Sequence, residues 1–265
     1  MMNILDFKKK KEAAEKICMI TCYDYTSARI LSNTLIDCIL VGDSLAMTMY
    51  GFQNTLSATL TMMQLHTGAV SRGAPNKFII TDLPFLSFRK SLSKTVSAAE
   101  TLIRNGAQAL KIEGAAGNLK IIRHLVESGV PMMGHLGFTM QYMHTLGNTI
   151  VQGKTEAHAK RLQEEALLLQ DAGCFAVVLE CMPTQLAKTI SENLIIPTIG
   201  IGAGPHTDGQ VLVFQDVLGL NIDFKPKFVK NFTDGYAQHK QSLDAFAHAI
   251  KLGVFPQDEN CYQSS

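Results

Sequence analysis

Short apolar runs alternate with stretches of helical periodicity along almost the whole chain. Seven runs have the length of a strand and lie at 17–21, 38–41, 77–81, 108–112, 131–134, 175–179 and 197–201; an eighth lies at 211–214 or at 217–220. Between them, apolar spacing of three and four residues predicts helices at 26–37, 59–72, 93–106, 118–129, 155–173, 184–193 and 238–252. Because parallel strands need helical crossovers that cover both faces of the sheet, this alternation predicts an α/β protein, a closed (β/α)8 TIM barrel, with an open doubly wound sheet as the alternative.

Cap and turn residues mark the ends of several predicted elements. Ser93 and Asn118 stand where two helices begin and are predicted N-caps. Gly200, Gly202 and Gly204 follow a strand, but the third glycine comes one residue too early for the dinucleotide-binding spacing G-x-G-x-x-G. We therefore interpret the three glycines as a tight turn that needs positive φ angles.

Four of the apolar runs end on an acid, at Asp43, Asp82, Glu113 and Glu180. Parallel strands end at the same edge of a sheet, so these carboxylates are expected together where α/β proteins bind metals and carry out catalysis. The first three end consecutive strands and can converge on Mg²⁺, which prefers a few carboxylates together with water and substrate oxygens. No Cys or His pair has the spacing of a zinc site. The competing interpretation is that such an acid caps the following helix.

Three further side chains extend this candidate site. Lys111 and Glu113 flank one residue and so point to the same side of a strand. A lysine beside a bound cation is costly because the two positive charges repel, so we expect a substrate anion between them. His135, after the run at 131–134, is a candidate hydrogen-bond donor to substrate or cofactor, although a histidine beside glycines is more often structural. Glu180 lies farther round the barrel, which fits a proton-abstracting base better than a metal ligand.

Composition limits the class of protein. The 265 residues hold 24 Lys and Arg against 23 Asp and Glu, and a net charge of +1 supplies no field to attract nucleic acid or an anionic membrane. No apolar run approaches the ~20 residues of a membrane span, and the N-terminus lacks the pattern of a secretory signal. The six cysteines show no C-x-x-C spacing and read as buried apolar residues in a reducing compartment. We expect one barrel domain over 1–265 in the cytoplasm, with no nucleic acid or membrane partner.

The same residues carry a family resemblance. Seven segments, in order along 17–256, resemble the motifs of the ketopantoate hydroxymethyltransferase family: GDSL at 42–45, TDLPF at 81–85, KIEG at 111–114, GHLG at 134–137, LEC at 179–181, GIGAG at 200–204 and KPKFVK at 225–230. The resemblance implies a Mg²⁺-dependent barrel of the phosphoenolpyruvate/pyruvate type that assembles as a homodecamer. It also implies transfer of a hydroxymethyl group from 5,10-methylenetetrahydrofolate to 3-methyl-2-oxobutanoate in pantothenate synthesis.

Position by position, the resemblance assigns roles to the acids and their neighbours. It implies one Mg²⁺ per subunit held by the acids Asp43, Asp82 and Glu113. It implies Glu180 as the proton acceptor, and substrate contacts from Asp43, Ser44, Asp82 and Lys111. His135 joins these expected substrate contacts from its position in the sequence. The chain departs from the family pattern at Ala46, usually glycine, and at Ser57 and Met140, both usually proline. These departures bear on loop geometry and folate affinity, because none is a catalytic position.

Two other functions are weighed against this one. A carbon–carbon lyase of the isocitrate lyase type would use the same barrel and metal, but it needs a catalytic cysteine in a loop of basic residues and glycines. No cysteine of this sequence has that setting. A non-catalytic descendant that only binds keto acids is expected to have lost Lys111, Glu113 or Glu180, and the chain keeps all three.

Overall fold

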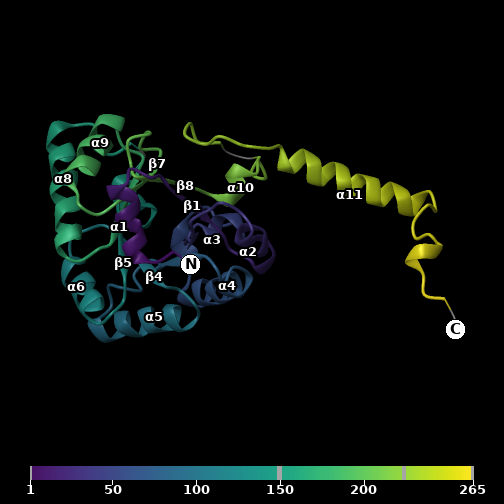
Figure 1. The fold of residues 1–265 in the computed structure, drawn as a ribbon, viewed down its shortest axis with the longest axis horizontal. Helices are drawn as coiled ribbons and strands as arrows, with labels where there is room; N and C mark the ends of the chain where they lie inside the picture. Colours follow the sequence, from purple (N-terminus) through teal and green to yellow (C-terminus); the bar gives the residue numbers. More distant parts are fainter. Residues whose placement is uncertain (1, 148–150, 223–224, 264–265) are drawn as a thin grey trace. The chain divides into compact units, whose positions relative to one another are not determined.

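Eight parallel strands close into a barrel in the computed structural model, which describes residues 2–147, 151–222 and 225–263 (Figure 1). Each strand pairs with the next along the chain, and the last pairs with the first. The strands are β1 Ile17–Thr21, β2 Cys38–Val41, β3 Phe78–Asp82, β4 Ala109–Glu113, β5 Met132–Gly137, β6 Ala176–Glu180, β7 Thr198–Ile201 and β8 Gly209–Leu212. The predicted (β/α)8 barrel is confirmed, and the open doubly wound sheet is wrong.

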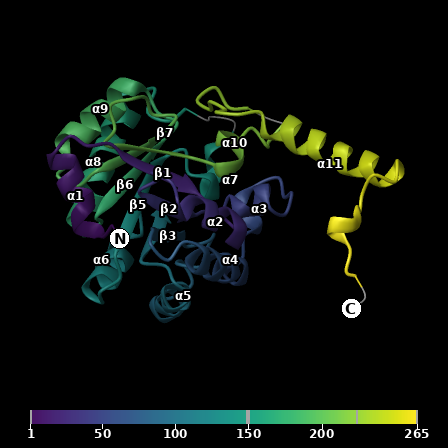
Figure 2. The ribbon, with the colours of Figure 1, turned by 45° about the vertical axis from the view of Figure 1, so that its right-hand side comes forward.

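Helices connect the strands and cover the outside of the barrel. Figures 1 and 2 show α4, α5, α6, α8 and α9 outside the strands. The α-helices up to β8 are α1 Ile4–Glu12, α2 Tyr25–Ser32, α3 Leu45–Thr48, α4 Leu60–Gly73, α5 Leu92–Arg104, α6 Leu119–Glu127, α7 Met143–Leu146, α8 Glu156–Asp171 and α9 Thr184–Asn193; two 3₁₀ turns are η1 Thr55–Ser57 and η2 Met140–Tyr142.

The predicted helix caps need correction. The N-cap of α5 is Ser91 rather than Ser93, because the Ser91 side chain accepts the amide of Lys94 from an extended backbone. Helix α6 does begin after Asn118, but the Asn118 side chain does not cap it. The Asn118 amide instead donates to the carbonyls of Glu113 and Gly114, both at 2.9 Å, and so fixes the end of β4. Helix α2 is shorter than predicted and ends at Ser32.

Two strands also differ from the prediction. Strand β5 continues to Gly137 because it pairs with β6 from Met133 to Gly137, so His135 lies within the strand rather than after it. The eighth strand is the first of the two alternatives, displaced to Gly209–Leu212 by its register with β1. The glycine turn after β7 is confirmed for two of its three glycines, with φ of +63° at Gly202 and +81° at Gly204, but Gly200 lies within β7 and has no positive φ.

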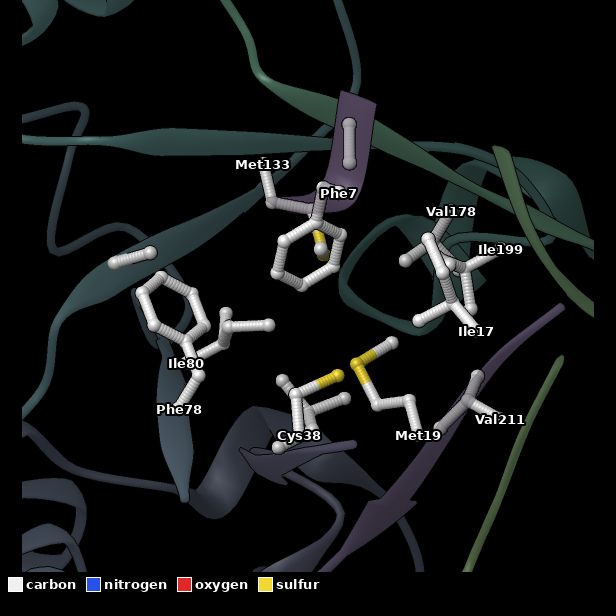
Figure 3. Close-up of a cluster of buried hydrophobic side chains, with 13 residues drawn as sticks. Phe7, Ile17, Met19, Cys38, Phe78, Ile80, Met133, Val178, Ile199 and Val211 are labelled. Atoms are coloured by element: carbon white, nitrogen blue, oxygen red, sulfur yellow. The ribbon is translucent and has the colours of Figure 1, made fainter. Parts of the chain in front are cut away.

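The lower half of the barrel interior is apolar, and helix α1 closes it. The Phe7 ring of α1 is fully buried among strand side chains, beside Phe78 (Figure 3). It lies 5.5 Å from the Phe78 ring and 5.0 Å from the Phe175 ring, both edge to face. Met19, Cys38, Ile80, Met133, Val178, Ile199 and Val211 belong to the same cluster. The amino-terminal end of the barrel is therefore a packed apolar floor.

The inward-facing row of each strand changes from apolar to ionisable toward the carboxyl end. Alternate residues of a strand point to the same side. Strand β3 places Phe78, Ile80 and then Asp82 inward, and β4 places Ala109, Lys111 and then Glu113. The rows of β5 and β6 reach His135 and Glu180 in the same way. Charge is thus concentrated directly above the apolar floor.

Chain contacts divide the protein into two compact units, Met1–Val213 and Phe214–Ser265. The first unit holds the complete barrel. The second holds α10 Phe214–Val217, α11 Gly235–Lys251 and the 3₁₀ turn η3 Asp258–Asn260. The expectation of one domain over 1–265 stays a prediction. In the part of the chain that the structure describes, no helix combines the length and apolar character of a membrane span.

Candidate active site

The ionisable side chains of β3 to β6 form one buried cluster at the carboxyl end of the barrel. Asp82, Lys111, Glu113 and His135 are each no more than 5% exposed, and Glu180 is half-buried. Strand register sets their order, since Asp82 pairs with Lys111 and Glu113 pairs with His135. Five of the residues predicted from the sequence therefore lie together.

Asp43 joins this cluster from the turn after β2. Its backbone N–H donates to Oδ2 of Asp82 at 3.0 Å, which ties the two neighbouring strand ends together. The other oxygen of Asp82, Oδ1, lies 3.1 Å from the Lys111 ammonium. Asp82 thus shares its two oxygens between the Asp43 backbone and Lys111. The structure does not use these acids as helix caps, so the competing interpretation fails for both.

Crowding of buried acids sets their protonation. Burial, together with the charges of Asp82 and Glu113, raises the pKa of Asp43 well above its ordinary value. Burial also raises the pKa of Asp82, against the opposing charge of Lys111. For Lys111, burial lowers the pKa, but the three surrounding carboxylates outweigh it and hold the ammonium charged. With Glu180, the cluster holds four acids against two basic side chains, Lys111 and His135, and this excess of acids favours an additional cation.

His135 links two carboxylates across the site. Its Nδ1 lies 3.3 Å from Oε1 of Glu113, and its Nε2 lies 3.1 Å from Oε2 of Glu180. Burial and the Lys111 charge oppose the imidazolium, but the two glutamates outweigh them and raise the pKa of His135 to about 9. His135 in turn lowers the pKa of Glu113 against the effect of burial. At neutral pH both ring nitrogens therefore carry protons, and the 3.3 Å approach of Lys111 to Nδ1 is a contact between two cations held by carboxylates.

The sequence predicted that the carboxylates of Asp43, Asp82 and Glu113 could converge on one point, but in the structure they do not. Among the residues that the structure describes, no group of three or more His, Cys, Asp or Glu side chains is arranged to hold a metal ion. Glu113 is turned away from Asp43 and Asp82. Its Oε2 accepts a hydrogen bond from the backbone N–H of Gln141 at 2.9 Å, and its Oε1 lies beside His135. Asp43 and Asp82 remain adjacent, and Mg²⁺ commonly takes only one or two carboxylates, with water and substrate oxygens completing the octahedron. The adjacent carboxylates of Asp43 and Asp82, and the excess of acids around them, therefore fit a Mg²⁺ ion that takes its other ligands from water and substrate.

Ser44 is held by a residue that the sequence did not single out. The Ser44 hydroxyl lies 2.7 Å from the hydroxyl of Tyr23, which is fully buried after β1. Burial raises the pKa of Tyr23 to about 12, so the phenol stays neutral. The Tyr23 carbonyl contacts the His66 ring, which also lies 3.0 Å from the Tyr50 hydroxyl. The Ser44 hydroxyl is thus oriented by Tyr23, which is itself held by His66.

Gln141 is a second residue that sequence reasoning missed. Its side-chain amide donates to Asp43 Oδ2 at 2.8 Å and to the Leu83 carbonyl at 3.0 Å, while its backbone N–H donates to Glu113. One glutamine therefore fixes two of the acids. A polar residue inside a loop belongs to no periodic pattern. The one signal in the sequence is that Gln141 follows the candidate site residue His135 by six positions.

The backbone below Glu180 is fixed by β5. Phe138 donates its amide to the Glu180 carbonyl at 2.9 Å, and a Cβ on Gly137 would lie 2.0 Å from that carbonyl oxygen. Only glycine fits at this position, where φ is +97°. The main chain of Glu180 is therefore anchored, and its side chain moves by rotation alone.

Sequence comparison gives a match over almost the whole chain. A family model described as "Ketopantoate hydroxymethyltransferase" matches residues 1–258. Proteins named 3-methyl-2-oxobutanoate hydroxymethyltransferase are 55% identical in Francisella tularensis subsp. novicida, with 99% of each chain covered, and 55% identical in Bdellovibrio bacteriovorus, with 99% of this chain and 100% of the relative covered. The one from Coxiella burnetii is 55% identical over 98% of this chain and 99% of its own.

Solved structures with low sequence identity share the fold. Phosphonopyruvate hydrolase in complex with oxalate and Mg²⁺ has a TM-score of 0.64 at 9% identity, covering 99% of this chain and 92% of its own. The 2,3-dimethylmalate lyase, a member of the PEP mutase/isocitrate lyase superfamily, has a TM-score of 0.58 at 14% identity, covering 99% and 93%. These similarities show that the barrel fold is shared.

Proposed function

Because the chain belongs to the ketopantoate hydroxymethyltransferase family, we propose that it transfers a hydroxymethyl group from 5,10-methylenetetrahydrofolate to 3-methyl-2-oxobutanoate. The product is 2-dehydropantoate, a precursor in pantothenate synthesis. The observation that carries the proposal is the cluster of Asp43, Asp82, Lys111, His135 and Glu180 at the mouth of the barrel, in a chain 55% identical to proteins of that name.

Asp43 and Asp82 are proposed to hold one Mg²⁺ per subunit, with Glu113 beside them. When bound, Mg²⁺ would supply positive charge to the carboxylate and keto oxygens of the substrate and so make the proton on C3 more acidic. Lys111 brings a second positive charge to the same place, because its ammonium is held 3.1 Å from Asp82. A 2-oxo acid is an anion of the size and charge that these groups together can bind.

Glu180 is the proposed proton acceptor. It is the acid of the cluster that stands apart from Asp43 and Asp82, and a carboxylate that is free of metal can accept a proton. His135, at 3.1 Å, directs one oxygen of Glu180 and leaves the other for the substrate. Ser44, positioned by Tyr23, is a proposed donor to the substrate carboxylate.

The proposed reaction balances with one water molecule. C3 of the keto acid gives its proton to Glu180, and the electron pair of that C–H bond forms a C–C bond to the methylene carbon of the folate. The two C–N bonds of that methylene break in turn, and each nitrogen gains a hydrogen, one originating from C3 and one from water. The hydroxyl of the same water ends on the transferred carbon. The buried donors around the site supply preorganised stabilisation of the developing charge.

A homodecamer in the cytoplasm is proposed as the working form. The second unit supports an assembly, because the α11 side chains Leu243, Phe246 and Ile250 share one helix face and are each at least half exposed. Light scattering should give a mass close to 290 kDa, ten times the 29.0 kDa of one chain. A mass of one chain at micromolar concentration would overturn the decamer. All six cysteines are free, which suits a reducing compartment.

The enzymatic test combines the purified protein with Mg²⁺, 3-methyl-2-oxobutanoate and methylenetetrahydrofolate. The expected result is 2-dehydropantoate in equal amount to tetrahydrofolate, with none formed when the keto acid or the folate is left out. Adding a chelator should stop product formation, and restoring Mg²⁺ should recover it. Absence of product from folded protein with all components present would reject the proposed activity.

A further inference from the structure

A cavity of about 410 Å³ opens beside the carboxylate cluster. Two loops at the carboxyl end of the barrel line it: the segment after β3, with Phe85, Leu86, Phe88 and Arg89, and the segment after β5, with Gln141 and Tyr142. Its volume is within the range of about 300–1,000 Å³ that is typical of small-molecule sites. None of the reaction steps described above uses it.

Gln141 connects this cavity to the site of chemistry. The residue lines the cavity, and its side-chain nitrogen donates to Asp43 and to the Leu83 carbonyl. Since both of those partners are acceptors, the amide orientation is fixed with its NH₂ group toward the carboxylates. Gln141 thus contacts both the cavity and the proposed metal ligand Asp43.

The other end of that amide lacks a partner. Gln141 is 5% exposed, and its Oε1 atom is buried with no hydrogen bond among the described residues. A buried carbonyl oxygen left in this state is costly. Because Gln141 lines the cavity, an occupant with a hydrogen-bond donor at the Gln141 end would relieve this cost.

The remaining walls define the rest of the occupant. Phe85, Leu86 and Phe88 offer apolar surface for a flat ring, and Arg89 stands exposed beside them. Nη2 of Arg89 donates to the Ala116 carbonyl at 2.9 Å and to the Tyr142 hydroxyl at 2.7 Å, which holds the guanidinium at the rim. An arginine has five N–H groups, so others remain for an anion. The cavity suits a flat heterocycle with N–H groups that carries an anionic tail.

We propose that this cavity is the folate subsite of the transfer reaction. An N–H of the reduced pterin donates to Gln141 Oε1, and this contact places the one-carbon end of the folate against the keto acid. The pterin packs against Phe85 and Leu86, and the glutamate tail leaves past Arg89. This assignment rests on the proposed function, since the folate is the only substrate of that reaction with this shape and charge.

Filling the cavity tests the assignment. Thr145 also lines the cavity, is exposed, and uses its hydroxyl only to bond the Tyr142 carbonyl at 2.9 Å. Thr145→Trp puts an indole where the pterin is proposed to lie. The matched control is Thr101→Trp on α5, whose hydroxyl makes the same kind of local bond, to the Ser97 carbonyl at 2.8 Å. Phe85→Ala is a second variant, which removes a wall that is 39% exposed and leaves the core intact.

Binding and exchange are measured separately. Calorimetry follows tetrahydrofolate, which cannot be turned over, on protein saturated with Mg²⁺ and keto acid. Exchange of the C3 hydrogen with D₂O, followed by NMR without folate, reports on the keto acid site alone. For Thr145→Trp we expect folate affinity to fall at least about tenfold more than the exchange rate, and for Phe85→Ala about three- to tenfold, as for loss of one packed aromatic contact. Thr101→Trp should bind folate as the wild type does.

The outcomes distinguish the subsite from the function. If the wild type binds tetrahydrofolate and both cavity variants bind it within twofold of the wild type, the folate lies elsewhere and the subsite assignment is wrong. If the wild type itself binds no tetrahydrofolate while it still exchanges the C3 hydrogen, the proposed transfer from folate fails, and the subsite with it. If Thr145→Trp loses exchange and folate binding equally, the cavity serves the keto acid, which also overturns the proposal.

Discussion

The imidazole Nε2 of His135 lies 3.1 Å from Oε2 of Glu180, so the proposed base is in contact with a cation. The pKa of His135 is raised to about 9, which keeps the imidazolium charged at neutral pH. A charged His135 can donate to Glu113 and to Glu180 at once, whereas a neutral ring keeps one N–H and can donate to only one of them. The stability of the protein and the orientation of the proposed base, Glu180, thus both depend on His135.

His135 should make stability depend on pH. Its pKa is above 6.5 in the folded state, so its charged form stabilises the fold fully below 6.5 and this contribution is lost as the pH rises through about 9. In metal-free protein, the wild type should lose up to about 3 kcal/mol of unfolding free energy relative to His135→Gln over this range. Urea unfolding from about pH 6 to about pH 10 measures the difference. A difference that is independent of pH would contradict the assigned imidazolium.

Glu180→Gln should separate proton abstraction from binding. The variant keeps the shape of the side chain, so Mg²⁺ and keto acid should still bind, while C3 hydrogen exchange falls by ~10²–10⁴-fold, as on loss of a general base. Glu156→Gln, in the exposed first turn of α8, is the control and should exchange at the wild-type rate. Exchange at the wild-type rate in Glu180→Gln without product would place Glu180 in a later step. Loss of metal or keto acid binding would place it in the binding shell.

Asp82→Asn should weaken Mg²⁺ binding more than the fold. It removes one of the two adjacent carboxylates and the partner of Lys111, so activity at limiting Mg²⁺ should fall at least about tenfold. Asp208→Asn is a matched control at the other end of the barrel, where Asp208 pairs with Lys11 at 2.8 Å. It should lower stability and leave the Mg²⁺ dependence unchanged. Equal Mg²⁺ dependence in Asp82→Asn and the wild type would reject the metal site.

Met140→Pro should stabilise the protein. Met140 begins η2, where its N–H is not needed by the turn, and the preceding Thr139 has the extended backbone that proline requires of its neighbour. Reducing the freedom of the unfolded chain should add about 0.4–1 kcal/mol to the free energy of unfolding. Urea unfolding of both forms measures it. A loss of stability would mean that the Met140 side chain matters more than the backbone.

The strands and their acids were predictable because both signals are local. An apolar run of strand length with an acid after it, as at Phe78–Asp82, needs no knowledge of the rest of the chain, and parallel pairing then brings Asp82 and Lys111 together. His135 could not be placed in a strand from its neighbours, because glycines on both sides weaken the strand pattern. Its place in β5 comes from pairing with β6.

The contacts made by loops could not be predicted. Gln141 reaches Asp43 across 98 positions of sequence, and Tyr23 reaches Ser44 from a different strand end. Such contacts depend on how each loop folds over the barrel, which no periodicity encodes. The same contacts turn Glu113 toward Gln141 and His135, so the single convergence point expected for three acids is not formed in the described residues.

The packed floor below the charged cluster restricts how protons and solvent reach it. Phe7 and its neighbours fill the barrel from the amino-terminal end, which leaves the mouth as the route for exchange with bulk water. The keto acid is proposed to bind in that mouth. On this proposal, a deuteron that Glu180 takes from C3 is held beside the carbon from which it came, and its return competes with its escape. The rate at which C3 deuterium is lost to solvent, divided by the rate of product formation, thus measures how readily water reaches the site while substrate is bound.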